Sequence, residues 1–117
     1  MTTRVVLDAP LGRVEATDDR GREFAVVAFW PDQATLDSML VRTRVWAERD
    51  LHEPEMEHLD DAGRAAYVAE YVAEMNRPGW VQCWRSTRYD AEHEAERLGQ
   101  TFARTGALVC VVEALPV

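Results

Sequence analysis

The clearest hydrophobic pattern of the chain lies in its last third, between Trp80 and Leu115. Residues 80–85 are rich in β-formers and partly alternate, which predicts a strand. Residues 107–112 form a continuous apolar run with branched side chains, which is typical of a strand covered on both faces. Between them, apolar residues recur at steps of four, three and four along one stripe of a helix: Ala91, Ala95, Leu98 and Phe102.

The first thirty residues contain three further strand candidates. Residues 4–7 and 13–17 are short, the second alternates weakly, and a turn is predicted between them at residues 8–12. Asp18–Gly21 has the composition of a hairpin connection, because Asp tolerates turn geometry and Gly supplies a positive φ. Residues 23–30 are apolar on both faces, which predicts a central strand rather than an edge.

Two helices are predicted in the middle of the chain. Pro31 suits a helix start, and residues 32–50 present one apolar face. Pro54 interrupts residues 51–59, which predicts a linker or a short helical turn. Asp60 or Asp61 then suits the N-cap of a second helix.

The second helix contains the tandem repeat Tyr-Val-Ala-Glu, at residues 67–70 and 71–74. A four-residue repeat drifts slowly around a helix axis, so the two tyrosines form one stripe and the two valines another. The predicted order is therefore β-β-β-α-α-β-α-β in a single domain over residues 1–117. It indicates an α+β fold with a mixed sheet of about five strands, two to three helices packed on it, and a ferredoxin-like second half.

The strands at residues 23–30 and 107–112 are apolar on both faces, so both faces of the sheet must be covered. The helix over residues 90–104 covers one sheet face, and either the other helices or a second copy of the chain must cover the other. The second option predicts a homodimer through the open sheet face.

Composition limits the class of protein. A chain of 117 residues is long enough to bury a core without disulfides or metal. It has no long uncharged apolar run, and its N-terminus lacks the apolar core of a signal peptide, so we expect a cytoplasmic location. Cys83 and Cys110 fall in predicted strands, where we expect small buried thiols rather than a disulfide. The glycines form neither a P-loop nor a dinucleotide fingerprint, so we expect no cofactor.

The chain has a net charge of −8, and residues 51–79 contribute −5 of it. Such a charge disfavours direct binding of nucleic acid and of anionic membranes. Seven carboxylates in fourteen residues, opposed only by Arg49, form what we call the acidic segment: Glu48, Asp50, Glu53, Glu55, Glu57, Asp60 and Asp61. The segment is either a solvated polar face or a docking surface for a basic protein partner. A nucleic-acid mimic is an extreme form of the second interpretation.

A second candidate joins the end of the strand at residues 80–85 to the helix that follows. Ligands of α/β sheets bind beyond strand ends, and a helix N-terminus attracts anions. A small-anion or enzyme site at this corner would use Trp84, Arg85, Thr87 and Arg88. The simpler interpretation is a helix cap flanked by solvated arginines.

Two other groups of residues are candidates for a site. His52 and His58 are six residues apart, with Pro54 between them, so their spacing does not predict a metal site. Trp80 and Trp84 are expected to share one face of their strand, either in the core or in an aromatic interface.

Neither Ser nor Cys has a histidine base near it in the sequence, which favours a non-enzymatic protein. The leading hypothesis is an acidic protein-binding module of the inhibitor, immunity or adaptor type.

Overall fold

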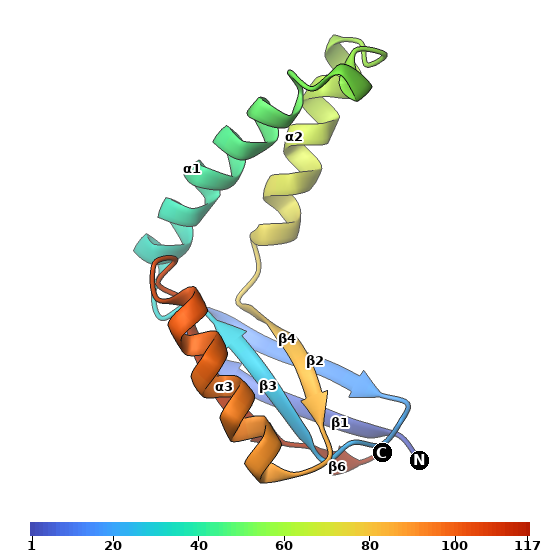
Figure 1. Cartoon of the computed structure of the whole chain (residues 1–117), viewed down its shortest axis with the longest axis vertical. Helices are drawn as coiled ribbons and strands as arrows, with labels where there is room; N and C mark the ends of the chain where they lie inside the picture. The colour runs from blue at the N-terminus through green and yellow to red at the C-terminus, as the bar shows by residue number, and fades with distance from the viewer. The chain divides into compact units, whose positions relative to one another are not determined.

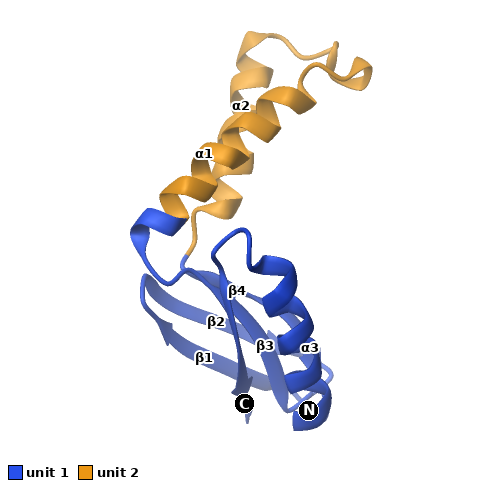
Figure 2. Cartoon of the chain, turned by 60° about the vertical axis from the view of Figure 1, so that its left-hand side comes forward, with its two compact units in different colours: residues 1–35, 78–117 blue, residues 36–77 orange.

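The computed structural model describes all 117 residues, and they form two compact units. Unit 1 comprises residues 1–35 and 78–117, and unit 2 comprises residues 36–77 (Figure 2). The single domain expected from the sequence remains a prediction.

Unit 1 contains two three-stranded sheets in which every neighbouring pair of strands is antiparallel. The first sheet has the order β2-β1-β6, formed by Gly12–Asp18, Thr3–Ala9 and Leu115–Pro116. The second has the order β4-β3-β5, formed by Gly79–Arg85, Phe24–Phe29 and Leu108–Glu113. The α+β class is confirmed, with six strands in two sheets instead of about five in one mixed sheet.

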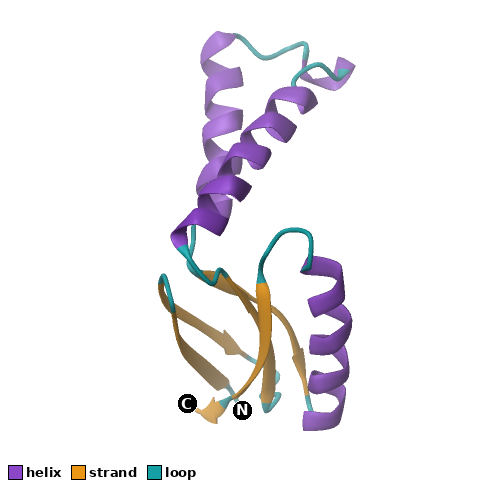
Figure 3. Ribbon diagram, turned by 90° about the vertical axis from the view of Figure 1, so that its left-hand side faces the viewer, coloured by secondary structure: helices purple, strands orange, loops and turns teal.

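The second half of the chain forms a split β-α-β unit. The helix α3, Arg88–Phe102, connects β4 to β5, and both strands pair antiparallel with β3 between them. The outer strands are therefore parallel to each other, as in ferredoxin-like arrangements. Figures 1 and 3 show α3 running along one side of this sheet.

The central strand β3 is buried on both faces, as its sequence predicts. Ala25, Val26, Val27 and Ala28 are all fully buried. On one face, Val26 packs with Ala91 and Leu98 of α3, which are the apolar stripe of that helix. On the other face, Ala25 and Val27 pack with the first sheet, in a cluster that also contains Val5 and Val14.

This second cluster shows what covers the other face of the sheet β4-β3-β5. The sheet β2-β1-β6 covers the face that the sequence left open, so neither a helix pair nor a second copy is needed there. The expected homodimer through an open sheet face therefore loses the observation on which it rested.

The connection from the second strand to the third differs from the prediction. The hairpin lies between β1 and β2, where Ala9 pairs with Gly12. Asp18–Gly21 does form a turn, in which Gly21 has a φ of 72° and donates to the Asp18 carbonyl at 3.0 Å. This turn leads from one sheet to the other rather than joining paired strands.

A β-bulge in β4 separates the two tryptophans of that strand. Cys83 pairs with Val26 and Val81 with Val27, so Gln82 has no partner across the ladder. An extra residue reverses the side-chain alternation beyond it. Trp80 consequently meets Phe102 of α3, with ring centroids 5.9 Å apart, whereas Trp84 packs in the cluster between the two sheets. The expectation that Trp80 and Trp84 share one face was wrong for this reason.

Unit 2 is a helical hairpin. Its two helices are α1, Gln33–Asp50, which begins in unit 1, and α2, Asp61–Met75. A short 3-10 helix, η1, Pro54–Met56, lies in the connection between them (Figure 1). Pro54 thus opens a helical turn instead of continuing α1. Ala47 and Leu51 pack against Val68 at this end of the hairpin.

The helix boundaries agree with the sequence signals. Asp60 is the N-cap of α2, and its carboxylate accepts a hydrogen bond from the Gly63 amide at 2.7 Å. Thr87 is the N-cap of α3, and its hydroxyl accepts from the Asp90 amide at 3.2 Å. No helix combines the length and apolar composition needed to cross a lipid bilayer.

Candidate functional site

The acidic segment lies at the end of the helical hairpin, where α1 gives way to η1 and then to α2. Unit 2 as a whole carries ten acidic and five basic residues, and thus −5 of the net charge of −8. Six of the seven carboxylates of the segment belong to exposed residues, and only Asp50 is half-buried. The structure therefore gathers these acids in one region rather than scattering them.

None of the seven carboxylates forms an ion pair. Eight ion pairs lie in unit 1, where arginines neutralise nearby acids. Arg49, the basic residue inside the segment, is exposed and takes no part in them. The negative charge of the segment is consequently not cancelled within the molecule, which leaves a one-sided field around it.

Two of the seven acids have structural roles. Asp60 caps α2, as described above. Asp50 accepts a hydrogen bond from the Tyr67 hydroxyl at 3.1 Å. Burial, helped by Asp50 and Tyr71, raises the pKa of Tyr67 to about 12, so Tyr67 remains a neutral donor at physiological pH. The tyrosine stripe is formed as predicted, with the rings of Tyr67 and Tyr71 5.3 Å apart.

Arg64 holds the backbone that carries the acids. Its guanidinium donates to three carbonyl oxygens, those of Leu51 at 3.0 Å, Leu59 at 3.3 Å and Met56 at 3.4 Å. A planar group with five donors suits this task, because it can reach several acceptors from one position. The connection between α1 and α2 is therefore tied to the first turns of α2.

Sequence reasoning missed this role of Arg64. A signal for it was present, since Arg64 is the only arginine between Asp50 and Asn76, and it comes three residues after the last acid of the segment, Asp61. Its partners are carbonyl oxygens rather than the neighbouring carboxylates, and only the course of the chain could reveal that.

The strand–helix corner has a different character. Arg85 donates to the Trp84 carbonyl at 2.8 Å and lies 3.8 Å from Glu94. Arg88 lies over the ring of Phe24, 5.1 Å from its centroid, and forms ion pairs with two carboxylates, Glu92 and Glu113. An incoming anion would have to compete with these acids for both arginines, so the anion site remains a prediction.

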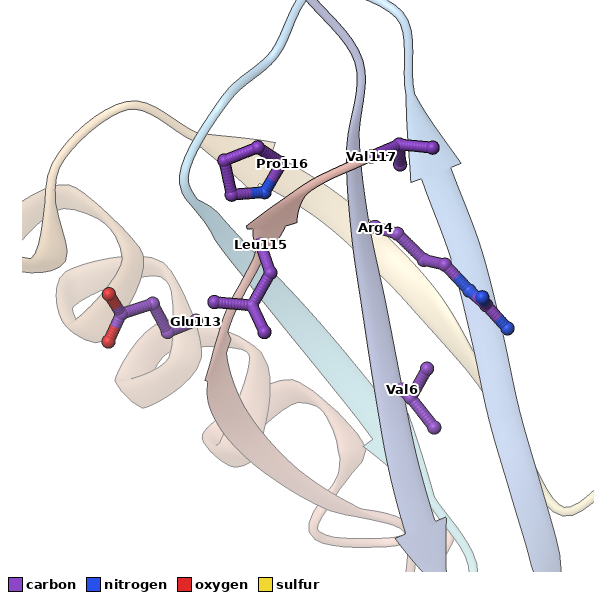
Figure 4. Close-up of a pocket in the computed structure, with 6 residues that line it drawn as sticks. All are labelled: Arg4, Val6, Glu113, Leu115, Pro116 and Val117. Atoms are coloured by element: carbon purple, nitrogen blue, oxygen red, sulfur yellow. The ribbon is translucent and has the colours of Figure 1, made fainter.

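A cavity of about 340 Å³ lies between β1 and the C-terminal strand of unit 1 (Figure 4). Val6, Leu115 and Val117 give it exposed apolar walls. Its two charged residues point away from each other in Figure 4, and each already has a partner: Arg4 binds Glu15 at 2.6 Å, and Glu113 pairs with Arg88. No pair of polar groups converges here on a common reacting atom.

The remaining candidates are the two histidines and the two cysteines. His52 and His58 are exposed in the connection between α1 and α2, and no group of three or more His, Cys, Asp or Glu side chains is placed to hold a metal ion. Cys83 and Cys110 are free thiols on strands that flank opposite sides of β3, and burial raises the pKa of both.

Together these observations define an α+β protein whose helical hairpin carries an acidic, unneutralised end. Comparison with models of known protein families, with curated proteins and with solved structures finds no match to this chain. The function must therefore be inferred from the site itself.

Proposed function

We propose that the chain is a non-enzymatic binding module that docks a basic protein partner through its acidic segment. The observation that carries this proposal is the absence of any ion pair to the seven carboxylates, whereas eight ion pairs neutralise acids in unit 1. A segment whose only role was solubility would not require its acids to be concentrated in one connection.

The physical role of such a surface is to guide association. A concentrated field of one sign raises the encounter rate with an oppositely charged partner and disfavours partners of the same sign. The side chains of three exposed glutamates of the connection form no hydrogen bond or ion pair that binding would break: Glu53, Glu55 and Glu57. They are the residues we expect to contact the partner most directly.

The fixed backbone of the connection supports this proposal. Arg64 holds three of its carbonyls, and Asp60 fixes the start of α2. A surface that is ordered before binding loses less conformational entropy when the partner arrives. The acids can then be presented in a constant arrangement, which favours selection of one partner over general attraction to cations.

The test is a crosslinking pull-down from the cells that produce the protein, with three forms of the full chain as bait. The first is the wild type, and the second replaces Glu53, Glu55 and Glu57 by Gln. The third replaces three exposed acids outside the segment by Gln, to match the change in net charge: Glu70, Glu74 and Glu96.

We expect a partner of net positive charge that the wild type and the control variant both retain and the segment variant loses. Raising the salt concentration should weaken this capture, because exposed charges are screened. Equal recovery of the same partners by all three baits would contradict the proposal.

A further inference from the structure

The helix α2 is more apolar than its burial explains. Ten of its fifteen residues are Ala, Val, Tyr or Met, yet Val68 is its only buried residue. A helix that is apolar around most of its circumference normally lies inside a protein or against a partner. The hairpin therefore has an apolar face that the chain itself does not cover.

A groove runs between the two helices on this face. It has a volume of about 350 Å³ and lies wholly within unit 2. Its floor is apolar, since Leu51 and Val68 are buried there and the small side chains of Ala65 and Ala69 form one wall. Such a groove accepts a side chain that projects from another helix.

The opposite wall of the groove, on α1, combines two charges of opposite sign. Arg44 and Glu48 line the groove one helical turn apart, both are exposed, and neither belongs to any ion pair. Val41 lies three residues before Arg44 and seven before Glu48, which places it on the same face of α1. The Val41 side chain is 65% exposed, so an apolar side chain projects from α1 next to the two charged ones.

From this arrangement we infer that a second copy of the chain docks on the groove face, with the two α1 helices antiparallel about a two-fold axis. When two identical helices pack antiparallel about a two-fold axis, the two residue numbers of every facing pair add up to the same total. An axis midway between Arg44 and Glu48 sets Arg44 opposite the second copy's Glu48, and repeats that pair by symmetry.

The same axis sets Val41 opposite the second copy's Leu51, which is the buried residue at the end of the groove. A single register of the two helices therefore pairs the opposite charges and also places Val41 against an apolar residue. It also directs the two acidic segments away from each other, whereas a parallel pairing would bring like charges together. A four-helix arrangement of two hairpins is a common way to complete such a core.

The test is sedimentation equilibrium of the full-length chain over a range of micromolar concentrations. We expect the wild type to form a dimer of the 13.3 kDa chain. Val41→Glu should produce a monomer, because it sets a charge in the apolar groove. Arg44→Glu and Glu48→Arg should each raise the dissociation constant by about tenfold or more, since each turns two attractive pairs into repulsive ones.

The double variant Arg44→Glu with Glu48→Arg restores opposite charges across the axis and should return the dissociation constant close to that of the wild type. Arg49→Glu makes the same change of charge elsewhere on α1 and should have little effect. Circular dichroism of each variant checks that the helices remain folded. A monomeric wild type, a dimer that Val41→Glu leaves intact, or a double variant no tighter than the single ones would overturn the inference.

Discussion

Replacing Arg64 by Ala should release the connection between α1 and α2 without unfolding the rest of the protein. Arg64 is the only side chain that donates to the carbonyls of Leu51, Met56 and Leu59. The Met56 carbonyl keeps its bond from the Leu59 amide, so removal of the guanidinium leaves the carbonyls of Leu51 and Leu59 to be satisfied by water. The apolar contacts of Leu51 with Val68 must loosen to admit that water.

The magnitude follows from the geometry of the three bonds. A hydrogen bond from a charged donor contributes about 1.5–3 kcal/mol when its partner is removed. The bond to Leu51 is short at 3.0 Å, whereas those to Leu59 and Met56, at 3.3 and 3.4 Å, are long enough to contribute little. Arg64 is half-buried, so we expect a total near the lower part of this range, about 2 kcal/mol.

Hydrogen exchange measures this change where it occurs. The amides of Met56, Glu57 and Leu59 are bonded within the connection, so their exchange reports its opening. A loss of about 2 kcal/mol should accelerate their exchange roughly 30-fold. Arg64→Lys, which keeps the charge but not the planar fork, should fall between the wild type and the Ala variant.

Arg49→Ala is the matched control, because it removes an exposed arginine of the same region that forms no ion pair. Exchange in that variant should remain near the wild-type rate. If Arg64→Ala leaves the rates of the three amides within about threefold of the wild type, the backbone is held by something else, and the reasoning about a fixed acidic surface fails.

Three further predictions concern unit 1 and the tryptophans. Gly79→Ala should lower the free energy of unfolding by about 1–3 kcal/mol in urea titrations, because an added Cβ would lie 2.5 Å from the Ala28 carbonyl; an unchanged midpoint would contradict this packing. The Arg22 side chain lowers the pKa of Asp18 from 3.8 to about 2, so the stability this carboxylate contributes is complete above 3.8 and is lost as the pH falls toward 2. Asp18→Asn should flatten the acid limb of the unfolding curve, and an acid limb identical to the wild type would refute the assignment. Trp46→Phe should shift the fluorescence emission to shorter wavelength, because Trp46 is 47% exposed while Trp30 is only 1% exposed; an unchanged spectrum would show that Trp46 is shielded in solution.

The elements of the fold could be predicted because each has a strong local signal. The strand β3 is apolar at every core position, and α3 has a clear four-three-four stripe, so both emerged with nearly correct bounds. The Gly at position 21 indicated a turn with positive φ, and the structure has one. These signals depend only on neighbours along the chain.

The arrangement of the strands could not be predicted in the same way. Whether Asp18–Gly21 joins paired strands or two sheets depends on which surface β3 covers, and that is decided by the whole core. The bulge at Gln82 is equally hidden, because an unpaired residue looks like any other in an alternating stretch. A shift of one residue then reversed the expected side of Trp80.

The two proposed surfaces lie on the same hairpin, and Glu48 belongs to both. They are nevertheless separable, because their other residues occupy different positions: Arg44 and Val41 are outside the acidic segment, and the glutamates of the connection do not line the groove. Arg44→Glu therefore alters self-association while leaving the charge of the segment in place. Neutralising Glu53, Glu55 and Glu57 does the reverse. A partner that is lost with Arg44→Glu but kept after neutralisation would bind the dimer rather than the acids, and this outcome would transfer the binding function from the connection to the paired helices.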